Sequence, residues 1–464
     1  MRKSVFPVLS FAVILVTAFG VFSIDAAGQS RRDIRRANQL VTEGNRSFNQ
    51  RNFRDAIDKY AEAIVHVPNN AGAHFWKGLA HRNLNENELA LNELNAALEK
   101  GFDKPLDIYL IRWRIHFENK NYDAALSDVN SGLAIDASNM DFRLAQGDLN
   151  FVNGRFQEAL AAYEQALVAT PNNAELYLNV AKIHYNLGNT DKQASAAQEA
   201  INRRTLGLAD AYLLLGDAFQ KKRDYPAATE AYQKALAANP NSYELYQTLA
   251  EVYRSQNRYD DAIATSRKAL GVFGTRGDIY TDLSWYYSLA NRHEEAAEAA
   301  KAGIKLSPTE YMAYTNLCRA YNDLERPEMA VRECNNALRI KPDDGETYFY
   351  LGRAHDLMNK PVEATQYYKR AVTGLEVFVK ERPDYSDGYY LLGNAYFADN
   401  QRQKAISAYR QALALIPAFA KARYNLGFLL ALEKDKGAAM EQYNALLSLD
   451  ASLAKDLKVE IDKL

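Results

Sequence analysis

The chain has 464 residues, with 48% hydrophobic and 25% charged side chains and a formal net charge of −2. This balance is typical of a packed globular protein, and with only 23 Gly and 12 Pro it excludes fibrous and disordered chains. The near-neutral charge gives no electrostatic basis for binding nucleic acid. The length exceeds that of a typical domain, so the chain holds several domains or one architecture that grows by repetition.

The first residues have the layout of an export signal. Arg2 and Lys3 precede an apolar run from Val5 to Phe22, and polar residues follow. A basic start with an apolar run is typical of a secretory signal peptide, and this run is also long enough for an uncleaved membrane anchor. Residues 1–27 are predicted to be one or the other, with a linker at 28–36. The chain is therefore expected to be exported, either periplasmic or otherwise extracytoplasmic, or held at the membrane by this segment. The arginines at 31, 32, 35 and 36 oppose translocation, so a cytoplasmic chain is the third alternative.

From residue 37 onward a pattern repeats about every 34 residues. A small residue in the middle of an apolar stretch recurs at Gly44, Gly78, Gly147, Ala181, Gly216, Ala250, Ser284, Cys318, Gly352, Gly393 and Gly427. Trp113 takes the remaining slot, and a second column, almost entirely alanine, follows twelve residues later. Apolar residues at three- and four-residue spacing predict two amphipathic helices in each repeat. The small columns allow the two helices to approach closely, and stacking of neighbouring repeats buries the apolar faces.

These columns resemble the tetratricopeptide repeat. The resemblance is clearest in residues 209–242, where the family pattern of aromatic and small residues is met by Tyr212, Leu215, Gly216, Phe219, Tyr225, Ala228, Tyr232, Ala235 and Pro240. It implies an all-α fold, a right-handed superhelical solenoid of antiparallel helix pairs whose first helices line a concave groove. Twelve units are predicted over residues 37–453, starting near residues 37, 71, 106, 140, 174, 209, 243, 277, 311, 345, 386 and 420.

Two segments depart from the period. The interval between Gly352 and Gly393 is seven residues longer than the others, and the extra residues lie between Thr373 and Pro383. Seven residues make about two helical turns, so the second helix of that unit can lengthen without losing its phase. The insertion is either tolerated for that reason or forms an apolar docking ridge. Residues 454–464 are predicted to be a capping helix with a polar outer face.

The sequence offers no pattern for catalysis or for a cofactor. No phosphate-binding loop, nucleophile elbow, paired-cysteine motif or closely spaced histidine pair occurs, so no enzyme, cofactor or metal is expected. Cys318 and Cys334 are predicted on the two helices of one unit, where they could meet. In an exported chain they form either a disulfide or two buried thiols.

The groove is where a partner is expected to bind. Candidate partner-binding residues are positions that the family turns toward the concave surface and that carry large apolar side chains. In the early units they are Leu110, Phe117, Leu144, Phe151, Leu178 and Tyr185, and in the late units Phe349, Tyr390, Phe397, Tyr424 and Phe428. The alternative for these residues is packing between neighbouring first helices.

Two functions fit this pattern. The first is a protein–protein interaction scaffold of the cell envelope that holds a peptide or protein segment in the groove. The alternative is a carbohydrate-handling subunit of an exopolysaccharide or cell-wall assembly or export system, because aromatic rings also stack on sugars. The expected partners are thus a protein or peptide, or a polysaccharide, with a membrane involved only through the N-terminal segment.

Overall fold

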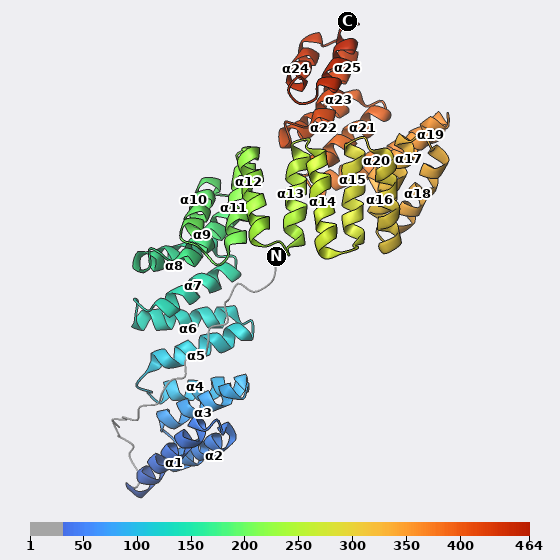
Figure 1. Ribbon diagram of the computed structural model, residues 1–464. Coiled ribbons are helices and arrows are strands. Elements are labelled where there is room, and N and C mark those ends of the chain that lie inside the picture. Colours follow the sequence, from blue (N-terminus) through green and yellow to red (C-terminus); the bar gives the residue numbers. More distant parts are fainter. Residues whose placement is uncertain (1–30) are drawn as a thin grey trace. The chain divides into compact units, whose positions relative to one another are not determined.

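The computed structural model describes residues 31–464, which fold into helices and the turns that join them. The predicted signal peptide or anchor and its cleavage lie outside the described residues. The helices form two compact units, one ending at Ala169 and one beginning at Thr170, and each is shown in Figure 1.

The first unit contains four helix pairs. Its helices are α1 (Arg31–Asn49), α2 (Phe53–His66), α3 (Ala71–Asn83), α4 (Asn87–Glu99), α5 (Pro105–Glu118), α6 (Tyr122–Ile135), α7 (Met140–Val152) and α8 (Phe156–Ala169).

The second unit contains eight further pairs and a last single helix. Its helices are α9 (Ala174–Asn186), α10 (Thr190–Asn202), α11 (Leu208–Lys221), α12 (Tyr225–Ala238), α13 (Tyr243–Ser255), α14 (Tyr259–Phe273), α15 (Gly277–Leu289), α16 (His293–Leu306), α17 (Tyr311–Asp323), α18 (Pro327–Ile340), α19 (Gly345–Leu357), α20 (Pro361–Glu381), α21 (Ser386–Ala398), α22 (Arg402–Leu415), α23 (Ala420–Leu432), α24 (Lys436–Leu446) and α25 (Ala451–Ile461). The fold is all-α, a stack of antiparallel helix pairs.

In several repeats the residue of the small column packs against a tyrosine of the same helix pair. At Gly147 an added Cβ would come within 2.4 Å of the ring of Tyr163, and at Gly393 within 2.5 Å of the ring of Tyr409. Both rings are almost completely buried, at 2% and 1% exposure. A side chain at the small position would therefore push the two helices of a pair apart, which explains the residue type in this column.

The turn within each pair has one shared conformation. One residue of the turn adopts a positive φ, and these residues are Arg51, Asn85, Lys120, Gly154, Gly188, Arg223, Asn257, Asn291, Glu325, Asn359, Asn400 and Lys434. Only two of these residues are glycine. Other residue types adopt a positive φ at a conformational free-energy cost of about 1 kcal/mol. The packing of the pair therefore holds the turn in place where the residue itself does not favour it.

Two predicted boundaries are corrected. Residues 31–36, expected in a linker, form the start of α1. They are held there because Arg36 pairs with Glu62 at 3.0 Å and Asp33 lies 3.2 Å from His66, so ion pairs to α2 extend the helix. The capping helix begins at Ala451 rather than residue 454, since Asp450 accepts hydrogen bonds from the first backbone N–H groups. Leu457 and Ile461 are buried on its inner side.

The insertion lengthens α20. This helix has 21 residues, against 14 in α18 and in α22, and seven residues add roughly 10 Å of helix. Beyond it, the loop between α22 and α23 and the first turn of α23 reach earlier pairs. The Asn257 side chain donates a hydrogen bond to Ala418 O at 2.6 Å, and Lys421 donates to Leu289 O at 3.3 Å. Figure 1 shows α21–α23 lying against one end of α13–α15.

Candidate partner-binding site

Three of the late aromatic candidates form one accessible cluster on α21 and α23. The ring of Phe428 lies 6.2 Å from that of Phe397 and 6.3 Å from that of Tyr424, the first pair edge to face and the second stacked. Phe397 is 38% exposed, and the other two rings are partly buried. We call these three residues the terminal aromatic cluster.

The other two late candidates are used for packing. Tyr390 lies 4.9 Å from Phe419 and 6.1 Å from Tyr409, centroid to centroid, and burial raises its pKa. Phe349 lies between Tyr350 and Tyr368, at 5.3 and 5.9 Å. The sequence placed all five aromatics on the groove, but only the terminal aromatic cluster lies together with a well-exposed ring.

The early candidates in the first unit also pack between helices. Phe117 lies 5.5 Å from Tyr122 and 6.5 Å from Trp113, and Phe151 lies 5.6 Å from Phe156. Leu110 and Leu144 are partly buried. The contacts of these four residues therefore favour packing between helices over an accessible partner-binding role.

The remaining two early candidates belong to the second unit and differ sharply. Leu178 is only 2% exposed, so its prediction as an accessible groove residue was wrong. It is buried because it packs against the turn at Gly207, where an added Cβ would meet it at 2.4 Å. Tyr185 is 46% exposed, with the Lys221 ammonium 4.4 Å from its ring centroid.

The two cysteines meet inside the second unit. Cys318 on α17 and Cys334 on α18 are fully buried, and their sulfurs are bonded at 2.07 Å with the Cα atoms 5.3 Å apart. Of the two alternatives, the structure contains the disulfide. It fastens the two helices of one pair together.

A buried ion pair that the sequence did not indicate joins distant repeats. Arg254 on α13 lies 2.8 Å from Asp387 on α21, and Asp387 is 1% exposed. Burial raises the pKa of Asp387, an effect that Arg254 opposes. Asp387 occupies a first-turn position where the helix dipole alone accounts for an acidic residue, so no sequence signal separated it from its exposed counterparts.

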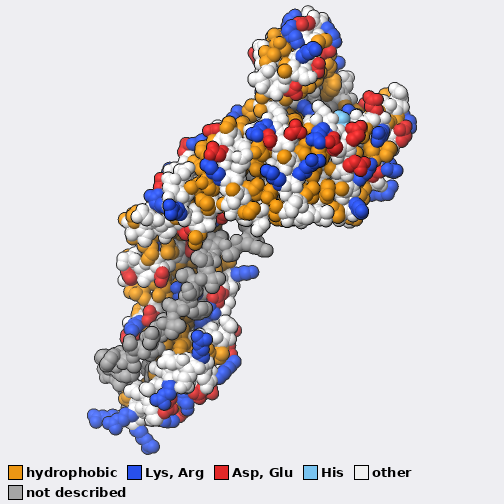
Figure 2. Space-filling model, viewed as in Figure 1, with side chains coloured by type: hydrophobic (Ala, Val, Ile, Leu, Met, Phe, Trp, Pro, Cys, Tyr) orange, Lys and Arg blue, Asp and Glu red, His pale blue; other side chains and the backbone are white. Residues whose placement is uncertain are grey.

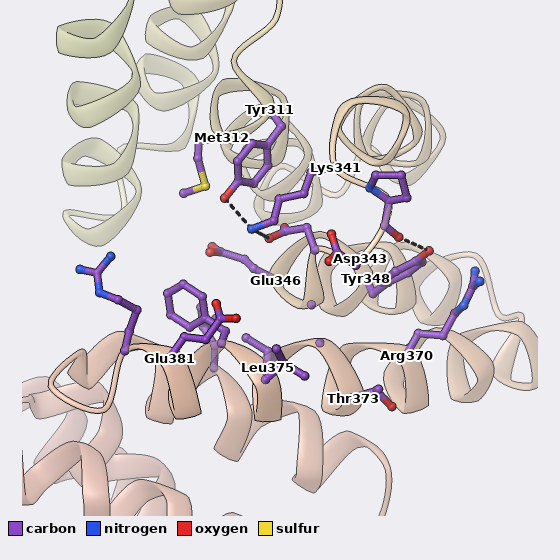
Figure 3. Close-up of a pocket in the computed structure, with 18 of the residues that line it drawn as sticks. Tyr311, Met312, Lys341, Asp343, Glu346, Tyr348, Arg370, Thr373, Leu375 and Glu381 are labelled. Atoms are coloured by element: carbon purple, nitrogen blue, oxygen red, sulfur yellow. Dashed lines mark hydrogen bonds and ion pairs between the residues drawn. The ribbon is translucent and has the colours of Figure 1, made fainter.

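A pocket of about 670 Å³ lies beside the C-terminal half of α20. Val377, Phe378 and Glu381 on this helix form one wall, and Tyr311, Lys341 and Glu346 belong to the other (Figure 3). Of the predicted insertion residues, Val379 is buried and Val377 is 54% exposed. The insertion therefore does more than lengthen a helix, because it builds one wall of a cavity.

The visible surface mixes both signs of charge with apolar patches. In Figure 2, basic and acidic side chains alternate over the second unit, and hydrophobic side chains gather along the edge where α14, α16 and α18 end. Val272, Leu306 and Ile340 lie at these ends and are 45%, 42% and 40% exposed. Such exposed apolar residues are common on protein surfaces.

Between Arg31 and Leu464 no three His, Cys, Asp or Glu side chains are grouped so that they could hold a metal ion. Within the same range no helix has both the length and the apolar character of a membrane span.

Models of one repeat family match five ranges of the chain, the last two of which overlap. A model described as TPR repeat matches residues 147–188 and 393–432. Two models described as tetratricopeptide repeat match residues 41–105 and 213–278, and residues 420–453.

Several curated proteins are similar in sequence to part of this chain. The Dictyostelium discoideum DnaJ homolog subfamily C member 3 homolog is 24% identical over 203 residues, 43% of this chain and 36% of the relative. The Plasmodium falciparum Hsp70-Hsp90 organising protein is 30% identical over 109 residues, 21% of this chain and 19% of the relative. The human protein O-mannosyl-transferase TMTC1 is 30% identical over 94 residues, 20% of this chain and 10% of the relative. The chain thus spans less than half the length of these curated relatives.

Solved structures show a loose likeness. Yeast Tom70 is 14% identical, with a TM-score of 0.40, over 91% of this chain and 96% of that one. The MamA protein is 26% identical, with a TM-score of 0.32, over 37% of this chain and 94% of that one.

The stacked helix pairs and the exposed aromatic cluster define a class: a helical-repeat protein with surfaces suited to binding. Each repeat buries its apolar face against its neighbours. In several helix pairs the glycine of the small column packs against a tyrosine ring of the same pair. Together with the matching models, this shows that the chain belongs to the tetratricopeptide repeat family.

Proposed function

We propose that this chain is a scaffold that binds a segment of another protein on the first helices of its last two repeats. The observation that carries the proposal is the terminal aromatic cluster. Phe397, Tyr424 and Phe428 lie together, with Phe397 left 38% exposed, whereas Tyr390 and Phe349 are used in packing. Clustered aromatic side chains supply much of the energy in protein interfaces. Binding rather than catalysis is therefore the proposed role.

We further propose that the scaffold acts outside the cytoplasm, as a component of the cell envelope. Two features support this location. One is the apolar N-terminal run after Arg2 and Lys3. The other is the bond between Cys318 and Cys334, because disulfides persist in oxidising compartments and are rare in the cytosol. Fractionation of cells that express the tagged full-length chain tests the location, and recovery in the cytosol alone would contradict it.

The binding site is tested by photocrosslinking in cells. A photoreactive phenylalanine analogue replaces Phe397 in one strain and Leu306 or Ile340 in control strains. The control residues are similarly exposed apolar side chains of the same unit, at 42% and 40%. We expect one protein to be crosslinked from position 397 and not from the control positions.

The variant Phe397→Ala/Tyr424→Ala then provides the affinity measurement. It is expected to bind the captured partner about tenfold more weakly, which is the range for loss of an aromatic anchor, with unchanged helix content. Equal crosslinking from all three positions, or unchanged affinity in the variant, would overturn the site. A glycan instead of a protein at position 397 would favour the carbohydrate alternative.

A further inference from the structure

The pocket beside α20 has an unusual combination of walls. Phe378 and Val377 come from the lengthened part of α20, and Tyr311 and Met312 begin α17 on the opposite side. Its volume of about 670 Å³ lies within the range of sites that enclose a small ligand or a large side chain. The walls are apolar and aromatic, with charged groups placed among them.

The basic side chains of the pocket are already engaged. Lys341 donates a hydrogen bond to the Tyr311 hydroxyl at 3.2 Å and lies 3.7 Å from Asp344. The Arg370 guanidinium lies 4.7 Å from the centroid of the Tyr348 ring. Arg382 lies 5.8 Å from the centroid of the Tyr385 ring. Each of these cations therefore has an acceptor or an aromatic face within the protein.

The acidic side chains are not matched in the same way. Asp343 and Glu381 form no ion pair with any described residue. Glu346 is 16% exposed, and its nearest cation is Arg319 at 4.0 Å. Arg319 is held in place by stacking on Trp285 at 3.9 Å. Burial raises the pKa of Glu346 to about 7, and Arg319 only partly opposes this. Glu346 is thus a largely buried carboxylate whose ion pair with Arg319 is long, at 4.0 Å.

Figure 3 shows the Glu346 side chain extending from α19 toward Met312 and toward Glu381 on α20. A cation placed between these two carboxylates would pair with Glu381 and add a second, closer cation to Glu346. Its aliphatic stem would lie along Phe378 and Met312, because long basic side chains bury their methylene groups and interact with aromatic faces. An anionic ligand in the same place would instead lie against the carboxylates of Glu346 and Glu381.

We propose that this pocket binds a lysine or arginine side chain of the partner segment, between Glu346 and Glu381. The inference rests on the proposed function, since it assigns a chemistry to the protein segment that the second unit binds. The lengthened helix α20 then has a recognition role, because without its last two turns the Glu381 side of the pocket would be missing.

The test uses the purified chain and three pools of fluorescent nonapeptides with random flanking residues. The central residue is fixed as lysine, norleucine or glutamate, and binding is followed by anisotropy at about pH 8, above the raised pKa of Glu346. Norleucine matches the aliphatic stem of lysine without its charge. We expect the lysine pool to bind at least about tenfold more tightly than the norleucine pool, the effect of a charge-assisted contact.

Glu346→Gln/Glu381→Gln is expected to remove this preference. Glu328→Gln/Glu363→Gln is the matched control, because it removes two exposed glutamates of the first turns of α18 and α20. The single variant Glu381→Gln changes an exposed residue that does not belong to the core. It is expected to weaken the lysine preference by about two- to fivefold, the effect of one exposed ion pair. Circular dichroism confirms that each variant is folded.

The outcomes separate the two proposals. If the lysine and norleucine pools bind equally, or if the pocket variant keeps the preference, the pocket assignment is overturned while binding at the terminal aromatic cluster stands. If the lysine preference is present but Phe397→Ala/Tyr424→Ala leaves partner affinity unchanged, the pocket assignment stands and the aromatic site fails. If no pool binds, the pocket assignment is overturned, and crosslinking from position 397 decides the aromatic site separately.

Discussion

Between Arg31 and Ala169 the helices pack against neighbours along the chain, and the ion pairs follow the same order, as between Arg36 and Glu62. From Thr170 onward the chain also joins repeats that are four pairs apart, through Arg254 and Asp387 and through Asn257 and Ala418. The first unit is thus a sum of adjacent contacts, as expected for a solenoid. In the second unit, a change in one repeat also affects repeats far from it in sequence.

One lengthened helix and one covalent bond lie between the repeats that are joined in this way. Helix α20 is seven residues, roughly 10 Å, longer than α18 or α22, and the loop after α22 lies against the turn at Asn257. The bond between Cys318 and Cys334 fixes the pair that precedes this change. We therefore expect variants in the second unit to have larger and more widespread effects than equivalent variants in the first.

The largest effect is expected from Asp387→Ala. It removes the buried counter-ion of the Arg254 guanidinium and leaves only the more exposed Glu251 beside it; breaking a buried ion pair typically costs about 3 to 5 kcal/mol. Urea unfolding followed by circular dichroism measures the loss. Hydrogen exchange should show weaker protection in both α13 and α21, which lie far apart in sequence. Asp384→Ala, an exposed residue of the preceding loop, should have little effect. Loss of protection in α21 alone would contradict the coupling.

Reduction of the disulfide is expected to come next. Cys318 and Cys334 are 16 residues apart, and a loop of this size contributes about 3 kcal/mol to the free energy of unfolding. Urea unfolding with and without dithiothreitol measures the change. The Cys318→Ala/Cys334→Ala variant should show the lower stability in both conditions. A stability loss that appears in the first unit by hydrogen exchange would argue against a local constraint.

A smaller effect is expected where α20 crosses the start of α19. A Cβ at Gly374 would lie 2.7 Å from Asp343 O and 2.8 Å from the Gly345 Cα. Gly374→Ala should therefore destabilise the second unit by about 1 to 3 kcal/mol, because backbone must move. Gly271→Ala in α14 is the control: no atom lies within 4 Å of its added Cβ, and the substitution should stabilise the helix by about 0.5 to 1 kcal/mol. Thermal unfolding distinguishes the two signs.

The first unit should respond to pH through Asp128. Its side chain is 4% exposed and lies 2.9 Å from Arg112, and burial raises its pKa to about 6. The folded state thus holds this proton more strongly than the unfolded chain, so the stabilisation is complete below about pH 4 and is lost as the pH rises to about 6. We expect a decrease of up to about 2 kcal/mol over this window, measured as protection of α5 and α6 in hydrogen exchange. Asp128→Asn should weaken this dependence and leave the part due to Asp148, whose pKa burial also raises to about 6. An unchanged dependence would assign it wholly to other groups.

Prediction from the sequence succeeded where the structure is local and repeated. The spacing of Gly147 and Gly216 was enough to indicate helix pairs, because only a small residue fits against the tyrosine rings of the same pair. The groove residues were harder. Leu178 and Phe397 are large apolar residues at family groove positions, yet one is 2% and the other 38% exposed. Which of them is covered depends on the neighbouring turn at Gly207 and on the end of the stack, and the repeat pattern records neither.

The sequence by itself determined the all-α repeat architecture and the lengthened α20, since periodicity and small-residue columns act over a few residues or between adjacent helices. It also placed Cys318 and Cys334 on the two helices of one pair. Only the tertiary structure decided that Asp387 meets Arg254, that the insertion forms one wall of a pocket, and which aromatic residues are left exposed. These features depend on the cumulative path of several repeats. Small rotations add up along a stack, so contacts between distant repeats follow from the assembled geometry and leave no periodic mark in the sequence.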